Sequence, residues 1–111
     1  MKIKEEIQQK ANAFLQICQS HHVASLYVFG SSFTDKFDEA SSDVDLLVEI
    51  DEPDPVLRGE QLMSLWDQLE TFFQRKVDLL TYSSVKNPVL KKNIEATKLL
   101  IYDGRGQKVL V

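Results

Sequence analysis

Cysteine is nearly absent from this sequence, because Cys18 is its only one. No disulfide can form within the chain, and a reducing compartment such as the cytoplasm is the expected setting. No apolar run approaches the ~20 residues that a membrane-spanning helix needs, and the stretch MKIKEEIQQK lacks the apolar segment of a signal peptide. Since Cys18 lies among helically spaced apolar residues, we expect a small buried hydrophobic side chain rather than a nucleophile.

Positive charge is scarce in one segment of the chain. Between Asp35 and Asp54, Lys36 is the single basic residue. The acids of this segment are Asp35, Asp38, Glu39, Asp43, Asp45, Glu49, Asp51, Glu52 and Asp54. Such a surface repels a nucleic-acid backbone, whose binding depends on Lys and Arg, and attracts divalent cations. A solvated acidic loop explains Glu49 to Asp54, but it does not explain why acids stand inside an apolar strand.

Apolar residues at helical spacing predict helices over residues 2–20 and 56–74. Ser31 or Ser32 would cap a short helix over 32–37, and a last helix is expected over 88–96. Asn87 caps the last helix and Pro88 is its first residue. His21 and His22 stand where the first helix ends, a position that suits imidazole on dipole grounds. A metal or catalytic role for these two is the weaker interpretation, since the chain holds no further histidine.

Short apolar segments predict strands over residues 24–29, 44–50, 77–81 and 99–102, and residues 107–111 either add a last strand or stay loose. The strand 44–50 is almost continuously apolar, which is typical of the centre of a sheet, and we expect 99–102 at an edge. The alternation of helices and strands predicts an α/β (α+β) fold, a mixed β-sheet with helices packed against it. The length predicts one domain, 1–111.

Three features on or beside these strands point to chemistry. Side chains alternate along a strand, so Asp43 and Asp45 share one face and Val44 takes the other. Carboxylates side by side repel each other unless a cation or a proton intervenes, and their oxygens suit Mg²⁺. Gly30 and Ser31 stand where a strand meets a helix, and backbone N–H groups at a helix start attract phosphate. Asp78, in the apolar run VDLL, needs a cation, a donor or a place at the sheet end.

The ordered set FGS, SDVDLLV and VDLL resembles the DNA polymerase β-like nucleotidyltransferases. The resemblance covers about residues 25–102, and the length points to the minimal nucleotidyltransferase branch, small proteins often paired with HEPN-domain toxins. It implies the nucleotidyltransferase topology and in-line transfer of a nucleoside monophosphate to a hydroxyl, with ATP as the expected donor. Asp43, Asp45 and Asp78 are the expected ligands of two Mg²⁺ or Mn²⁺ ions about 3.5–4 Å apart. Asp78 is also the candidate base, and Gly30, Ser31, Ser32 and Lys36 are expected at the phosphates.

One departure from the family pattern leaves two functions open. Members carry an Arg-Gly pair where this chain has Thr34 and Asp35, so a bidentate phosphate donor is missing and Lys36 is an imperfect substitute. The three acids favour an active enzyme. The lost pair favours an antitoxin-like subunit that neutralises a HEPN-type partner by contact.

The size of the chain also bears on the acceptor. We expect a separate polypeptide to form the far wall of the site and to supply a tyrosine, serine or threonine hydroxyl. The acidic surface disfavours a nucleic acid in this role. The base preference and the oligomeric state are left open by the sequence.

Overall fold

The computed structural model describes residues 2–30 and 43–110. Its helices are α1 (Lys2–Gln9), α2 (Ala11–Ser20), α3 (Pro55–Phe73), the short 3₁₀ helix η2 (Tyr82–Ser84) and α4 (Pro88–Thr97). Its strands are β1 (Val23–Val28), β2 (Val44–Ile50), β3 (Val77–Leu80), β4 (Leu99–Asp103) and β5 (Lys108–Val109). The expected helix 32–37 lies outside the described residues. No helix in the described part of the chain is both long and apolar enough to cross a membrane.

The strands form one mixed sheet in the order β3-β2-β1-β4-β5. β2 and β3 run parallel, and the other neighbouring pairs run antiparallel. The strand β2 is internal, as its apolar sequence predicts. β4 is not the edge strand that the sequence suggests, because β5 pairs with it at Tyr102 and Asp103. The mixed sheet with helices against it confirms the predicted fold class.

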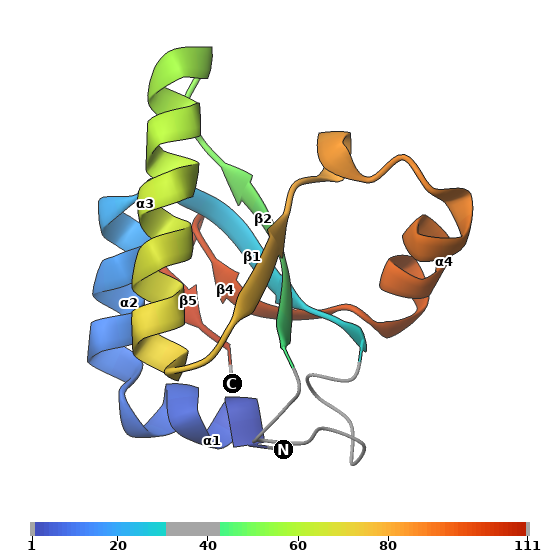
Figure 1. Cartoon of the computed structure of the whole chain (residues 1–111). Helices are drawn as coiled ribbons and strands as arrows, with labels where there is room; N and C mark the ends of the chain where they lie inside the picture. Colours follow the sequence, from blue (N-terminus) through green and yellow to red (C-terminus); the bar gives the residue numbers. More distant parts are fainter. Residues whose placement is uncertain (1, 31–42, 111) are drawn as a thin grey trace.

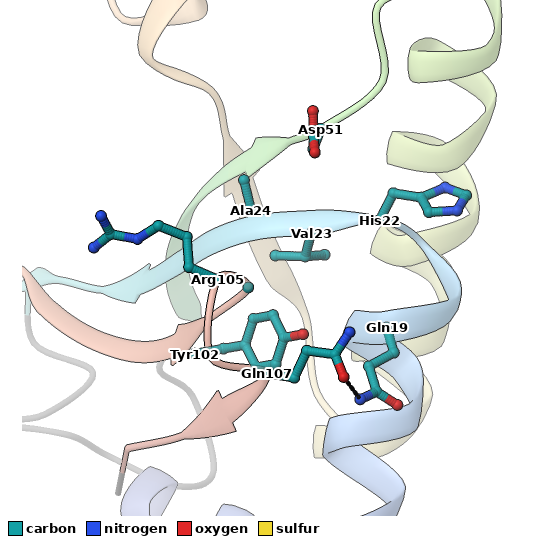
Figure 2. Close-up of a pocket in the computed structure, with 9 residues that line it drawn as sticks. Gln19, His22, Val23, Ala24, Asp51, Tyr102, Arg105 and Gln107 are labelled. Atoms are coloured by element: carbon teal, nitrogen blue, oxygen red, sulfur yellow. Dashed lines mark hydrogen bonds between the residues drawn. The ribbon is translucent and has the colours of Figure 1, made fainter.

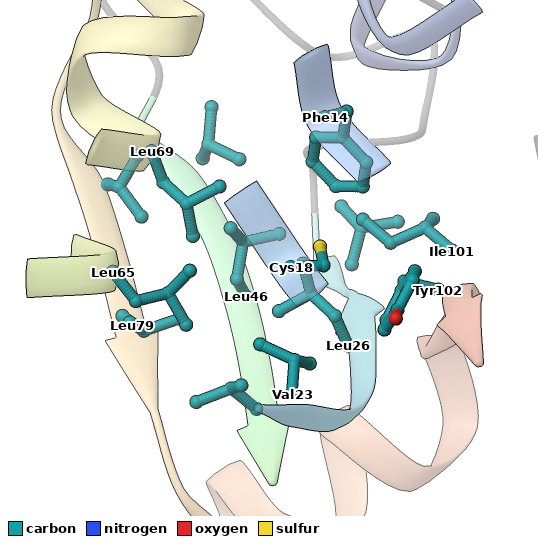
Figure 3. Packing of buried hydrophobic residues seen from close by; sticks show 14 of the residues in the cluster. Phe14, Cys18, Val23, Leu26, Leu46, Leu65, Leu69, Leu79, Ile101 and Tyr102 are labelled. Atoms are coloured by element: carbon teal, nitrogen blue, oxygen red, sulfur yellow. The ribbon is translucent and has the colours of Figure 1, made fainter. Parts of the chain in front are cut away.

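Helices cover the two faces of the sheet unequally. Figure 1 shows α1, α2 and α3 on one side and α4 standing apart on the other. On the first side, residues of α2, α3 and the strands form one apolar cluster, in which Phe14, Leu26, Leu46 and Leu69 are fully buried (Figure 3). Cys18 belongs to this cluster, and burial raises the pKa of its thiol to about 12, as suits a packing side chain.

The predicted helix 2–20 is two helices, with a break at Lys10 (φ −125°, ψ 41°). Neither proline nor glycine marks the break, so tertiary contacts explain it better than local propensity does. Glu6 on α1 forms an ion pair with Arg75, at the turn after α3, with a distance of 3.1 Å. Ile3 and Ile7 meanwhile remain fully buried in the same apolar cluster as Phe14. The break therefore lets α1 turn toward the end of α3 instead of continuing past it.

Side-chain caps fix the beginnings of α3 and α4. Asp54 accepts a hydrogen bond from the N–H of Val56 at 2.9 Å, and Pro55 follows it as the first helical residue. Asn87 accepts one from the N–H of Val89 at 2.8 Å, which confirms the predicted cap. Gln74 ends α3 in the left-handed conformation, φ 53°, and the chain then enters β3 directly. The end of α3 at Gln74 therefore lies three residues before β3, the strand that carries Asp78.

Candidate active site

Strand alternation places the predicted acids on the thinly covered face of the sheet. On β2, Val44 and Leu46 belong to the large apolar cluster on the α2–α3 side, whereas Leu47 belongs to a smaller cluster on the α4 side. Asp45 is two residues from Leu47 and so faces α4. On β3, the same argument separates Leu79, in the large cluster, from Asp78. Both carboxylates therefore point toward the side that α4 leaves open.

The parallel register brings the acids of the two strands together. Asp45 is paired with Asp78 across β2 and β3, directly beside the pair Val44 and Val77. Burial, then the charge of Asp78 and then the charge of Asp43, raise the pKa of Asp45 from 3.8 to about 6. Like charges this close disfavour a second ionised carboxylate in the same place. The structure thus places Asp43, Asp45 and Asp78 within one electrostatic environment.

Gly30, which follows β1, lies beside Asp45 at the edge of the site. Its φ of +68° lies in the left-handed region, and an added Cβ would stand 3.0 Å from Oδ2 of Asp45. Glycine is therefore required here both by its conformation and by the closeness of the carboxylate. The N–H of Gly30 donates to Oγ1 of Thr97 at 3.2 Å, so this donor is already engaged inside the protein. Ser31, Ser32 and Lys36 lie outside the described residues.

A cavity of about 500 Å³ opens between the acids and α4. It is lined by Phe29, Gly30, Asp45, Asp78, Leu80, Leu90 and Asn93. Its volume falls within the ~300–1,000 Å³ typical of small-molecule sites. Sequence reasoning did not select Leu90 and Asn93, because only the fold brings α4 opposite the acids. Leu90 is a large apolar residue that is 38% exposed, and this feature too is visible only in the folded chain.

The carboxylates of the site suit a hard divalent cation for which they would supply only some of the ligands. Across residues 2–30 and 43–110, no three Asp, Glu, His or Cys side chains gather closely enough to form a metal site by themselves. Mg²⁺ commonly takes one or two carboxylates and completes its shell with water and substrate phosphates. A cation beside Asp45 would also relieve the repulsion that raises the pKa of this residue. The residues present therefore suit Mg²⁺ bound together with a nucleotide.

A second cavity, of about 260 Å³, lies at the far end of the sheet from the acids. Figure 2 shows the Gln19 and Gln107 side chains joined across its floor, beside the ring of Tyr102. His22 lies at its border and is bonded to Gln61 at 2.7 Å. His21 is buried and bonded to Ser64 and to the carbonyl of Ile17. His21 thus contributes to packing and hydrogen bonding, the exposed His22 contributes a hydrogen bond, and neither joins the acids.

Comparison with known proteins agrees with this geometry. The family model described as "Nucleotidyltransferase domain" matches residues 2–101. Two proteins of Methanocaldococcus jannaschii named "putative protein adenylyltransferase" are each 34% identical to this chain. The first match spans 86 residues, 78% of this chain and 84% of the relative. The second spans 97 residues, 87% of this chain and 93% of the relative.

Solved structures share the fold. One described as a "putative minimal nucleotidyltransferase" is 25% identical with a TM-score of 0.60, covering 86% of this chain and 92% of that one. A toxin–antitoxin structure with AMP-PNP has a TM-score of 0.57 at 22% identity. The match covers 83% of this chain and 72% of that one. The structure of a tri-AMPylated Shewanella oneidensis HEPN toxin in complex with MNT antitoxin has a TM-score of 0.52 at 20% identity. The match covers 89% of this chain and 74% of that one. From its motifs, its fold and these matches together, this chain belongs to the nucleotidyltransferase domain family.

Proposed function

We propose that this protein transfers AMP from ATP to a hydroxyl group of a separate protein of the HEPN type. The pairing of Asp45 with Asp78, beside Gly30 and at the wall of an open cavity, carries the proposal. Two further findings support it. Relatives that match most of this chain are named as protein adenylyltransferases. A solved complex with the same fold contains an AMPylated HEPN toxin.

In the proposed reaction, Asp43 and Asp45 would hold Mg²⁺ and Asp78 would face the acceptor. Mg²⁺, when bound, neutralises phosphate charge and stabilises the charge that develops during transfer. The acceptor oxygen forms a bond to the α-phosphorus, the bond from that phosphorus to the bridging oxygen breaks, and pyrophosphate leaves. Asp78 accepts the proton of the hydroxyl. We expect Gly30, Ser31, Ser32 and Lys36 to contribute contacts to the β- and γ-phosphates.

The open side of the site suits an acceptor on another polypeptide. Leu90 and Asn93 on α4 line the cavity together with Asp78 and Leu80 of β3, and Val89 on α4 is 77% exposed. A partner that covers this side would exclude water and bring its hydroxyl to Asp78. Asp45 and Asp78 at the cavity wall, with the exposed Glu49 on the same face of β2, favour basic residues on that partner, so salt should weaken the complex.

The test is the intact mass of each chain after the protein and a co-expressed HEPN-type partner react with ATP and Mg²⁺. We expect adenylyl groups on the partner, and their loss in Asp45→Asn. Asp51→Asn is the matched control, because Asp51 follows the same strand at its opposite end and is exposed. Adenylylation of a nucleic acid or a small metabolite, with the partner unmodified, would contradict the proposal.

The replacement of the family's Arg-Gly pair by Thr34 and Asp35 favours a second function, neutralisation of the partner by contact alone. The two functions separate in Asp45→Asn. If contact suffices, this variant still protects cells that express the HEPN-type toxin, and the partner keeps its unmodified mass. If transfer is required, protection disappears although the two chains still co-purify.

A further inference from the structure

The hydroxyl of Thr97 connects the end of α4 to the turn at Gly30. Thr97 is the last residue of α4, and its Oγ1 accepts a hydrogen bond from the N–H of Gly30 at 3.2 Å. The same hydroxyl donates to the carbonyl of Asn93, one turn earlier, at 2.8 Å. A hydroxyl has one proton to donate and lone pairs to accept with, so both bonds form at once. The two joined residues are 67 positions apart in the sequence.

Gly30 in turn contacts the carboxylate of Asp45. Its backbone lies so close that an added Cβ would stand 3.0 Å from Oδ2 of Asp45, and the carboxylate would have to shift. A small movement of this turn therefore either opens a gap beside Asp45 or presses on it. Side chains that position a reacting group are typically needed to within about 0.5 Å. Thr97 is the side chain that fixes the N–H of Gly30 in the described structure.

Other contacts hold α4 in place without this hydroxyl. Ile94 is buried with Phe29 and Leu47 in the cluster on this face of the sheet. Lys98, just after the helix, has its ammonium 4.9 Å from the centre of the Tyr27 ring and hydrogen-bonds the Tyr82 hydroxyl. Loss of the Thr97 hydroxyl should therefore change the Gly30 turn while α4 stays docked.

We propose that Thr97 is a positioning residue for the nucleotide. Through its bond to Gly30 it holds the backbone of Gly30 in register with Asp45. The proposal rests on the proposed function, because it assumes that a nucleoside triphosphate binds beside Asp45. It assigns part of nucleotide affinity to a residue that touches neither the nucleotide nor the acids.

The test compares three variants by calorimetric titration with AMP-PNP in the presence of Mg²⁺. Thr97→Val removes the hydroxyl at nearly constant shape, and we expect about five- to tenfold weaker binding, the size of one lost hydrogen bond. Thr97→Ser keeps the hydroxyl and should restore the affinity. Thr71→Val is the matched control, since Thr71 also bonds the carbonyl four residues earlier, at 3.2 Å, but lies on α3.

Two additional measurements separate positioning from folding. The urea midpoint of Thr97→Val should stay close to that of Thr71→Val, and amide hydrogen exchange at Gly30 should accelerate only in Thr97→Val. Equal AMP-PNP affinity in the wild-type protein and Thr97→Val would overturn the role of Thr97. So would a loss of affinity that Thr97→Ser does not restore. Absence of AMP-PNP binding in every protein, the wild type included, would instead refute the proposed function.

Discussion

One face of the sheet carries most of the apolar packing, and the other carries the candidate active site. On the face covered by α2 and α3, alternate strand residues such as Leu46 and Leu79 join a large apolar cluster. On the face toward α4, the intervening residues include Asp45 and Asp78, and the buried apolar cluster comprises Phe29, Leu47, Val85 and Ile94. Carboxylates at close range cost free energy, and a well-packed opposite face offsets this cost. The thin cover on the α4 side leaves the acids accessible.

The largest expected effect comes from comparing two neighbouring residues of β2 that face opposite sides of the sheet. Leu46 and Leu47 are buried to the same degree, at 0% and 1% exposed, but face opposite sides. We expect Leu46→Ala to lower the free energy of unfolding by about 3–5 kcal/mol, because close packing prevents collapse around the cavity. Leu47→Ala should cost about 2–3 kcal/mol, since α4 can move toward the gap. Urea denaturation measures both, and an equal or larger loss in Leu47→Ala would contradict the comparison.

Glycine substitutions extend the comparison of the two faces of the sheet to the backbone. Gly30→Ala should cost about 1–3 kcal/mol, because it forces alanine into a left-handed conformation against Asp45. Gly59→Ala is the control, since nothing lies within 4 Å of an added Cβ on this α3 residue. That change should stabilise the protein by about 0.5–1 kcal/mol, the helix propensity difference. Thermal unfolding distinguishes the two, and stabilisation by Gly30→Ala would disprove the close contact.

The smallest expected effect concerns charge. The pKa of Asp45 is raised to about 6 in the folded chain, from 3.8. The folded state therefore binds the proton more tightly, and stability falls as the pH rises from about 4 to about 6. Without metal, Asp45→Asn should add about 1 kcal/mol above pH 7, a value reduced for solvent screening. The gain should vanish near pH 4.

Two controls accompany that measurement. Asp51→Asn, at the exposed end of the same strand, should leave the pH profile of unfolding unchanged. Mg²⁺ should raise the melting temperature of the wild-type protein by binding the folded state, and Asp43→Asn combined with Asp45→Asn should abolish this response. A gain from Asp45→Asn that persists at pH 4, or a metal response that survives in the double variant, would contradict the site.

Patterns in the local sequence predicted most of the strands and the face of the sheet on which the acids lie. The alternation at Val44 and Asp45 places the acid opposite the core, and it needs no information beyond the strand itself. The break at Lys10 carries no local signal, because it depends on contacts such as the ion pair of Glu6 with Arg75. The bond between Thr97 and Gly30 joins distant positions, so only the folded sheet reveals it. Likewise, Leu90 and Asn93 become cavity walls through the crossover from β3 to β4.

The junction of α3 with β3 has a consequence for solubility. β3 is at an edge of the sheet, where outward backbone groups can recruit a strand from another molecule. The N–H of Val77 donates to Glu70 at 3.0 Å, and the Trp66 indole donates to the carbonyl of Val77 at 2.6 Å. Lys76 bonds inward to Val44, so Val77 is the residue that faces outward there. By occupying both of its groups, α3 blocks the start of this edge against intermolecular strand pairing and hence against aggregation.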